Sequence, residues 1–298
     1  MKFLKLIGFG NLLLLAFAQF IFKYGFLDYQ SELVLALNDG KYALLVLACV
    51  SIAAGGFFIN ATAGIGKEPN ANMSEAKIYN IYIAFNLVGL GLGYYIADYI
   101  GRPSFMGIFV VAAATMYIYA NSLKQTLLIG NVLLAIISAL SIVVIGIFTL
   151  YPVISSYNQS QMATIFSLML DYSLFTFMMV FIITLLNDIK NTDQDYNEGL
   201  NTLPIAIGKQ RAAKVAFAFG IITAGMILYY INAYLKELLW AMGYILLFVL
   251  GPLVYFLINI WSAKTRKDYT ILEIVLSAML FCTALSVAVI TFNIKYNA

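Results

Sequence analysis

Apolar runs of about twenty residues recur along this chain, separated by short polar breaks. A lipid-embedded backbone must satisfy its own hydrogen bonds, so runs of this length predict membrane-spanning helices. Hydrophobic residues make up 63% of the 298 residues and charged residues only 10%, which leaves too little polar surface to cover a water-soluble globule. The sequence therefore predicts an all-α, polytopic membrane protein.

Nine apolar runs predict nine transmembrane helices, at residues 6–26, 42–62, 78–97, 103–121, 127–151, 165–187, 212–232, 238–261 and 271–293. Gly10-Asn-Leu-Leu-Leu-Leu-Ala opens the first run, and the similar Gly130-Asn-Val-Leu-Leu-Ala opens the fifth. We therefore expect a single transmembrane domain over residues 1–298. It would consist of two quasi-repeated halves, about 1–121 and 127–261, plus a ninth helix at 271–293.

Lysine and arginine are distributed unevenly between the two sides that these helices define. If the N-terminus lies inside, only five of the 17 basic residues fall at the outer side, namely Lys23, Lys41, Arg102, Lys236 and Lys295. Cytoplasmic loops carry the excess of Lys and Arg, so we expect a multi-pass protein of the cell membrane with a cytoplasmic N-terminus and Asp-rich loop. The net charge of +3 is modest and spread over loops, which gives no indication of a nucleic-acid partner.

One polar stretch, residues 187–211, stands out against this apolar background. On a helix that continues out of the membrane, a narrow sector would contain Thr184, Asp188, Asn191 and Asp195. The chain has no histidine, which excludes His-dependent triads and imidazole ligands, and its hard oxygen ligands suit Mg²⁺ bound together with substrate phosphates. A solvated loop is the competing interpretation. The sequence Gly199-Leu-Asn-Thr-Leu-Pro-Ile-Ala-Ile-Gly208 instead favours an ordered return into the seventh helix.

The pattern Asp188-x-x-Asn191-x-x-x-Asp195-x-x-x-Gly199-x-x-Thr202-Leu203-Pro204-x-x-x-Gly208 closely resembles the second aspartate-rich motif of the UbiA superfamily of intramembrane prenyltransferases. A second segment, Tyr119-Ala-Asn-Ser-Leu-Lys124 followed by Gly130-Asn131, is similar to the family's Tyr-Ser-x-x-Leu-Lys element and its Gly-Asn pair. The resemblance extends over the whole chain, and nine helices with polar loops on the inner side agree with it.

This resemblance implies Mg²⁺-dependent transfer of a polyprenyl group from its diphosphate to a lipophilic acceptor, either a glycerol lipid or a quinone-precursor ring. The reaction would take place among the membrane lipids. It implies the catalytic residues Asp188, Asp195 and Lys124. The implied Mg²⁺ ligands are Asp188, Asp195, Asn191 and Glu68. The residues expected to bind substrate are Asn60, Asn191, Asp193, Lys190, Asn11 and Arg211.

The first aspartate-rich motif of the family is degenerate in this sequence. Where the family has Asn-Asp-x-x-Asp-x-x-x-Asp, this chain has Asn60-Ala-Thr-Ala-Gly-Ile-Gly-Lys-Glu68, so that Ala61 and Gly64 replace two carboxylates. Two further hypotheses therefore stay open. Besides the prenyltransferase, one alternative is a catalytically impaired relative that binds isoprenoids or partners, and the other is a transporter that uses the two quasi-repeated halves.

Overall fold

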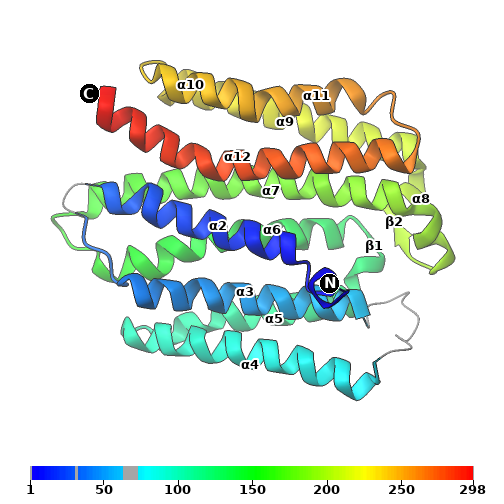
Figure 1. The fold of residues 1–298 in the computed structure, drawn as a ribbon, viewed down its shortest axis with the longest axis horizontal. Helices are drawn as coiled ribbons and strands as arrows, with labels where there is room; N and C mark the ends of the chain where they lie inside the picture. Colours follow the sequence, from blue (N-terminus) through cyan, green and yellow to red (C-terminus); the bar gives the residue numbers. More distant parts are fainter. Residues whose placement is uncertain (1, 31–32, 63–72, 298) are drawn as a thin grey trace.

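The structure, a computed structural model, describes residues 2–30, 33–62 and 73–297, and its long helices run roughly side by side (Figure 1). Two short helical pieces and three long helices form the first part of the bundle: α1 (Lys2–Leu6), α2 (Phe9–Gly25), η1 (Leu27–Tyr29), α3 (Asp39–Thr62) and α4 (Glu75–Tyr99). The middle part consists of η2 (Pro103–Phe105), α5 (Met106–Asn121), η3 (Leu123–Gln125), β1 (Thr126–Leu127), α6 (Ile129–Thr149), η4 (Tyr151–Val153) and α7 (Gln159–Asn197). The last part consists of β2 (Asn201–Thr202), α8 (Leu203–Ile207), α9 (Lys209–Tyr234), α10 (Leu239–Ile245), the π-helical η5 (Leu246–Leu250), α11 (Gly251–Asn259) and α12 (Arg266–Asn297).

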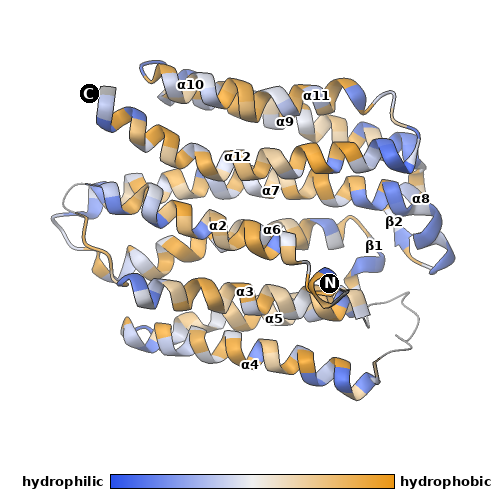
Figure 2. Cartoon of the chain, in the orientation of Figure 1, coloured by the Kyte–Doolittle hydropathy of each residue, from blue (hydrophilic) through white to orange (hydrophobic). Residues whose placement is uncertain are grey.

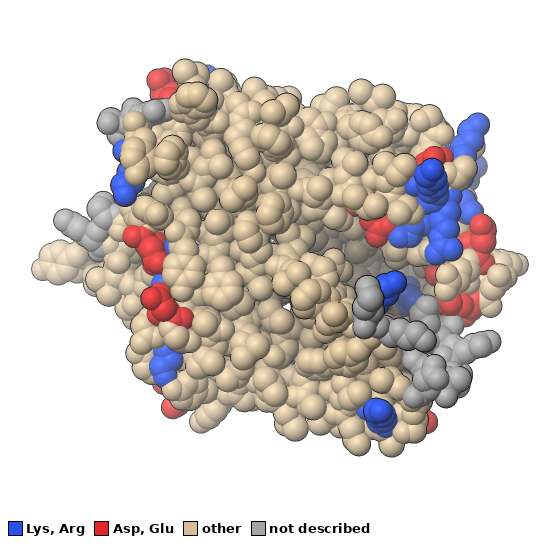
Figure 3. Space-filling view, in the orientation of Figure 1, with Lys and Arg blue, Asp and Glu red and all other residues tan. Residues whose placement is uncertain are grey.

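Within the described residues, nine helices are long and apolar enough to span a membrane. Hydrophobic residues fill their middle sections, and hydrophilic residues gather toward the two ends of the bundle (Figure 2). In the same orientation, charged side chains lie toward the two ends, and a broad band between them carries none on this face (Figure 3). The predicted all-α, multi-pass architecture is confirmed by these helices. The uncharged belt between the two ends is what a hydrocarbon core requires.

Three predicted helices have different limits in the structure. The first is interrupted at Gly8, whose φ of +62° is in the left-handed region that glycine tolerates. The sixth, predicted at 165–187, runs without a break from Gln159 to Asn197. At 39 residues and about 1.5 Å per residue it is about 58 Å long, so it projects well beyond a hydrocarbon core of about 30 Å. The eighth contains the π-helical segment η5.

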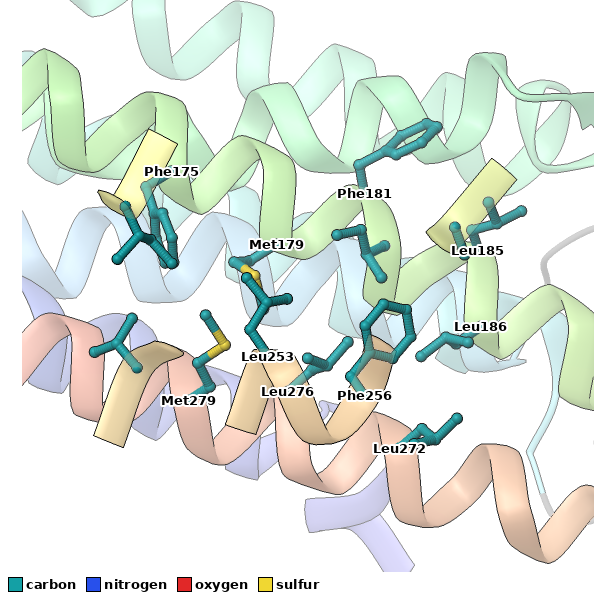
Figure 4. Packing of buried hydrophobic residues seen from close by; sticks show 14 of the residues in the cluster. Phe175, Met179, Phe181, Leu185, Leu186, Leu253, Phe256, Leu272, Leu276 and Met279 are labelled. Carbon is teal, nitrogen blue, oxygen red and sulfur yellow. The ribbon is translucent and has the colours of Figure 1, made fainter. Parts of the chain in front are cut away.

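The core is formed by α7, which packs against α6, α9 and α12. Figure 4 shows large apolar side chains of α7, α11 and α12 that interdigitate, among them Leu186, Phe256 and Leu276, all 0% exposed. Small residues allow other helices to approach closely. A Cβ added to Gly56 of α3 would lie 2.8 Å from the Met116 Cβ of α5. Such close backbone approach is a main source of helix association in lipid, where no hydrophobic force acts between helices.

The bundle has two chemically distinct ends. At the end where α2 finishes, the buried Lys23 ammonium is bound by the carboxylates of Asp28 at 3.2 Å and Asp39 at 2.5 Å. A buried cation is costly unless it is paired, so these contacts hold the α2–α3 connection in place. The other end, at which α5 and α7 finish and α6 begins, carries both recognised sequence motifs, and we call it the motif end.

Candidate active site

The polar stretch at the end of α7 is ordered by its own backbone. The N–H of Leu200 donates to the carbonyl of Asp195 at 2.9 Å, and the N–H of Gly199 donates to the carbonyl of Tyr196 at 3.1 Å. This pair of bonds with Gly199 at φ +73° is a Schellman motif, which ends a helix where glycine can adopt the left-handed conformation. Pro204 then occupies the first turn of α8, so the ordered return predicted for this segment is confirmed.

A short parallel pairing joins the two motif-bearing segments: β1, after Lys124, is hydrogen-bonded to β2, after the end of α7. Gly130 allows the start of α6 to fold back on the preceding turn. A Cβ at Gly130 would lie 2.9 Å from the Leu123 carbonyl oxygen, closer than real Cβ atoms approach. The glycine therefore permits the close approach that places Lys124 and the first turn of α6 beside α7.

The Asp188 carboxylate is at the centre of this arrangement. Its Oδ2 accepts a hydrogen bond of 2.8 Å from Nδ2 of Asn131, on the first turn of α6. Asp188 also interacts electrostatically with Asp195 and Lys124, so the structure brings together the three residues expected to be catalytic. Asp195 is 7% exposed. Two carboxylates and a lysine thus converge next to one buried amide.

A central cavity of about 400 Å³ lies between α2, α3, α5, α6, α7 and α12. At the motif end its wall is polar and includes Asn11, Asn60, Tyr119, Thr184, Asn187, Glu273 and Ser277. Farther into the bundle the wall is mainly apolar and includes Leu14, Phe22, Ile142, Val180 and Leu280. A cavity of this kind can take an amphipathic molecule, with its polar group at the motif end and its apolar chain between the helices.

Three other predicted site residues lie outside this convergence. The Lys190 ammonium forms an ion pair with the Glu273 carboxylate of α12. Lys209 at the start of α9 donates to both oxygens of Asp193, at 2.8 and 2.9 Å. Arg211 is exposed on the first turn of α9. Each of these cations is on the motif end, but none of them lines the central cavity.

Asn191 has side-chain partners on both α7 and α12. Its amide donates to Oδ1 of Asn187 at 3.0 Å, and its own Oδ1 accepts from the Arg266 guanidinium at 3.1 Å. Three residues of helix rotate Asn191 about 300° from Asp188, to the edge of the expected sector, where α12 provides a donor. The assignment of Asn191 as a ligand remains a prediction.

The residues present fit a Mg²⁺ ion whose coordination is completed by substrate phosphates and water. No group of three or more His, Cys, Asp or Glu side chains able to hold a metal is found in the described ranges. Mg²⁺ needs only one or two carboxylates when substrate phosphates and water complete its octahedron, and Asp188 and Asp195 meet that need. Asn60 adds a buried Oδ1 that has no hydrogen-bond partner among the described residues. The fourth expected ligand, Glu68, lies outside the described residues.

Asn131, Tyr119, Glu273 and Ser277 were not predicted from the sequence to be site residues. Asn131 was recognised only as part of the Gly-Asn pair, although an amide at 6% exposure within an apolar helix signals a specific polar partner. Glu273 had a comparable signal, since a carboxylate in the first turns of an apolar helix is costly unless paired. Tyr119 and Ser277 line the cavity. Tyr119 opens the segment that is similar to the family's Tyr-Ser-x-x-Leu-Lys element, whereas no charge singles out Ser277 among the other serines.

Comparison with known proteins identifies the class of protein to which this fold belongs. The model of the UbiA prenyltransferase family matches residues 68–281, which is most of the chain. The chain therefore belongs to the UbiA prenyltransferase family, as its motifs predicted.

Curated relatives carry a more specific name. The digeranylgeranylglyceryl phosphate synthase of Methanosphaera stadtmanae is 27% identical over 195 residues, which cover 63% of this chain and 62% of that protein. The protein of the same name from Thermococcus kodakarensis is 33% identical over 114 residues, 38% of this chain and 36% of the relative. The chain thus spans less than two thirds of the length of these relatives.

Solved structures confirm the fold over nearly the whole chain. A structure concerning digeranylgeranylglyceryl phosphate synthase in membranes has a TM-score of 0.64 at 15% identity, covering 96% of this chain and 97% of that one. A UbiA homologue from Archaeoglobus fulgidus bound to GPP and Mg²⁺ has a TM-score of 0.62 at 16% identity, covering 97% and 99%. At this identity the likeness establishes the shared fold.

Proposed function

We propose that this protein transfers a polyprenyl group from its diphosphate to the hydroxyl of a glycerol lipid within the membrane. The observation that carries this proposal is the central cavity, which has an apolar interior between the helices and a polar mouth lined by Thr184 and Asn187, neighbours of Asp188 along α7. The name shared by the relatives favours a glycerol-lipid acceptor over a quinone-precursor ring.

In this proposal, each residue of the convergence has a physical task. Asp188 and Asp195 would hold Mg²⁺, which when bound would neutralise the diphosphate and make it a better leaving group. Lys124 adds a fixed positive charge beside the same carboxylates. Asn131 orients the Asp188 carboxylate, and Asn60 and Asn11 offer amide groups at the cavity mouth.

The apolar interior has a second task, which is to exclude water. Departure of the diphosphate leaves positive charge on the allylic carbon, and water would capture it as hydrolysis. The apolar walls around the prenyl group leave the acceptor hydroxyl as the available nucleophile. Its oxygen would form the ether bond to the allylic carbon, and its proton would pass to the released diphosphate. Positioning and electrostatic stabilisation in a dry site then supply the rate, without a protein nucleophile.

The test is product formation in nanodiscs with geranylgeranyl diphosphate and Mg²⁺, analysed by mass spectrometry with a glycerol lipid or a quinone precursor as acceptor. The proposal predicts a prenyl ether of the glycerol lipid, and no product in Asp188→Ala. A prenylated aromatic ring as the only product would reject the acceptor class but retain the transferase.

A non-catalytic role is the second candidate, and Ala61 is the observation that favours it. This residue is near the end of α3, where the family motif has a carboxylate, and alanine offers no side-chain ligand. A folded protein that binds geranylgeranyl diphosphate but releases no diphosphate with any acceptor would support this candidate. Transport, the third hypothesis, would require substrate flux in proteoliposomes that survives Asp188→Ala.

We also propose that the motif end faces the cytoplasm. The excess of Lys and Arg gathers there, which is the distribution that sets topology. The variant Ser122→Cys tests the orientation, because Ser122 is an exposed residue of that end. It should react with a membrane-impermeant maleimide in inverted vesicles and resist it in intact cells.

A further inference from the structure

A second cavity of about 180 Å³ lies at the motif end, on the other side of α7 from Asn131. Its wall is formed where the ends of α7, α9 and α12 meet, and it includes four cations, Lys190, Lys209, Lys264 and Arg266. Figure 3 shows the gathering of basic residues at this end of the molecule. We call this cavity the cationic pocket. Its volume is far above the roughly 10–15 Å³ that a single water requires.

Carboxylates balance only part of this charge. Asp193 pairs with Lys209, and Glu273 pairs with Lys190. The Asp268 carboxylate accepts the backbone N–H groups of Lys264 and Thr265, at 3.0 and 2.8 Å, and so caps the start of α12.

Two cations of the pocket are therefore available to a ligand. Neither Lys264 nor Arg266 forms an ion pair with a carboxylate of the described residues, and Arg266 bonds only the neutral amide oxygen of Asn191. A planar guanidinium held by a neutral partner is preorganised to bind a phosphate through two parallel N–H groups. The pocket thus has the chemistry of a phosphate site.

The cationic pocket and the central cavity share a polar wall. Glu273 lines the central cavity while its partner Lys190 lines the cationic pocket. In the same way, Asn187 lines the central cavity and accepts a hydrogen bond from Asn191, which lines the pocket. A phosphate in the pocket would therefore lie one layer of side chains away from the space proposed for the reacting groups.

The geometry of α7 separates two anions. Lys190 follows Asp188 by two residues, about 200° round the helix, so the two side chains project from opposite faces. A diphosphate beside Asp188 and a second phosphate beside Lys190 would each have its own positive charge. The distance between the two faces would reduce their mutual repulsion, which falls as charges move apart.

We propose that the cationic pocket binds the phosphate group of a phosphorylated glycerol-lipid acceptor, apart from the diphosphate of the donor. This inference rests on the proposed prenyl transfer, and it assigns a binding site to the phosphate end of the acceptor, which does not react. Other sources of the same chemistry are an anionic membrane lipid and free phosphate, and the experiment distinguishes them.

The kinetic test uses the full chain in neutral phosphatidylcholine nanodiscs with saturating geranylgeranyl diphosphate. Arg266→Gln and, separately, Lys264→Gln should raise KM for a phosphorylated glyceryl ether lipid about tenfold or more, because each removes a hydrogen bond between charged groups. KM for the donor, kcat, and KM for the dephosphorylated lipid should not change. Lys267→Gln is the matched control, an exposed neighbouring cation that does not line the pocket. Equal effects on both acceptors, or an equal effect of the control, would overturn the proposal.

A binding test separates this proposal from the proposed function. Without donor or Mg²⁺, the phosphorylated lipid should bind wild type and Asp188→Ala equally and bind Arg266→Gln about tenfold more weakly. That result supports the pocket even if no turnover is detected. Displacement of the bound lipid by phosphatidylglycerol or inorganic phosphate at equal concentration would mean a general anion site and would overturn the acceptor assignment. Turnover in wild type with no effect of either pocket variant would overturn the pocket and leave the transferase intact.

Discussion

Replacing Asn131 by leucine removes the amide that orients Asp188 while nearly preserving side-chain volume. The lost contact is a 2.8 Å hydrogen bond to a carboxylate, between side chains that are largely shielded from solvent. Hydrogen bonds to charged groups contribute about 1.5–3 kcal/mol, which corresponds to roughly 10–150-fold in an equilibrium or a rate. Loss of a partner that orients a metal ligand typically costs about 10–100-fold in metal affinity or activity, a range that overlaps the first estimate.

We therefore expect Asn131→Leu to lower Mg²⁺-dependent diphosphate release by about one to two orders of magnitude at limiting Mg²⁺, with partial recovery at high Mg²⁺. The assay is diphosphate release in nanodiscs over a Mg²⁺ titration, with thermal unfolding measured on the same sample. Asn86→Leu is the matched control, because Asn86 is also buried in a spanning helix and donates to the Tyr82 carbonyl of its own helix α4. A folded Asn131→Leu within twofold of wild type at every Mg²⁺ concentration would refute the reasoning.

Three other predictions concern the metal, the carboxylates and the packing. Removal of Mg²⁺ with EDTA should abolish turnover, and Ca²⁺ should restore it poorly because it prefers longer bonds and more ligands; full recovery with Ca²⁺ would contradict this. Asp188→Ala and Asp195→Ala should each abolish Mg²⁺-dependent binding of labelled geranylgeranyl diphosphate, whereas Asp171→Ala, which lines a separate cavity about 25 Å along α7, should retain most of it. Equal retention in all three would reject the site. Gly56→Leu should destabilise the protein by about 1–3 kcal/mol in detergent unfolding because its Cβ meets a methionine of α5, while Gly91→Leu, which has open space, should not.

The spanning helices could be predicted from sequence because lipid imposes one strong rule, an apolar run of sufficient length. The limits of α7 could not. Residues 159–164 are mostly polar, and residues 188–197 are rich in Asp and Asn, so hydropathy ends the helix at both places although the backbone continues. Order after α7 was predictable, since Gly199 and Pro204 each have a specific conformational use.

The site was predictable to the extent that one continuous motif carries it. The structure brings Asp188 and Asp195 together with Lys124, and the sequence motifs had singled out each of them, while their catalytic roles stay predictions. The partners of Asp188 and Lys190 were not predictable. Asn131 and Glu273 are 57 and 83 residues away from them, and periodicity within one helix does not reveal which face of another helix lies opposite.

The most direct test of the central claim is Mg²⁺-dependent diphosphate release by the purified protein in nanodiscs, with geranylgeranyl diphosphate and a phosphorylated glycerol-lipid acceptor. The account predicts release that depends on both Mg²⁺ and acceptor and is lost in Asp188→Ala, with prenylated lipid formed in equal amount. Folded protein that releases no diphosphate with any polyprenyl donor or acceptor would contradict it.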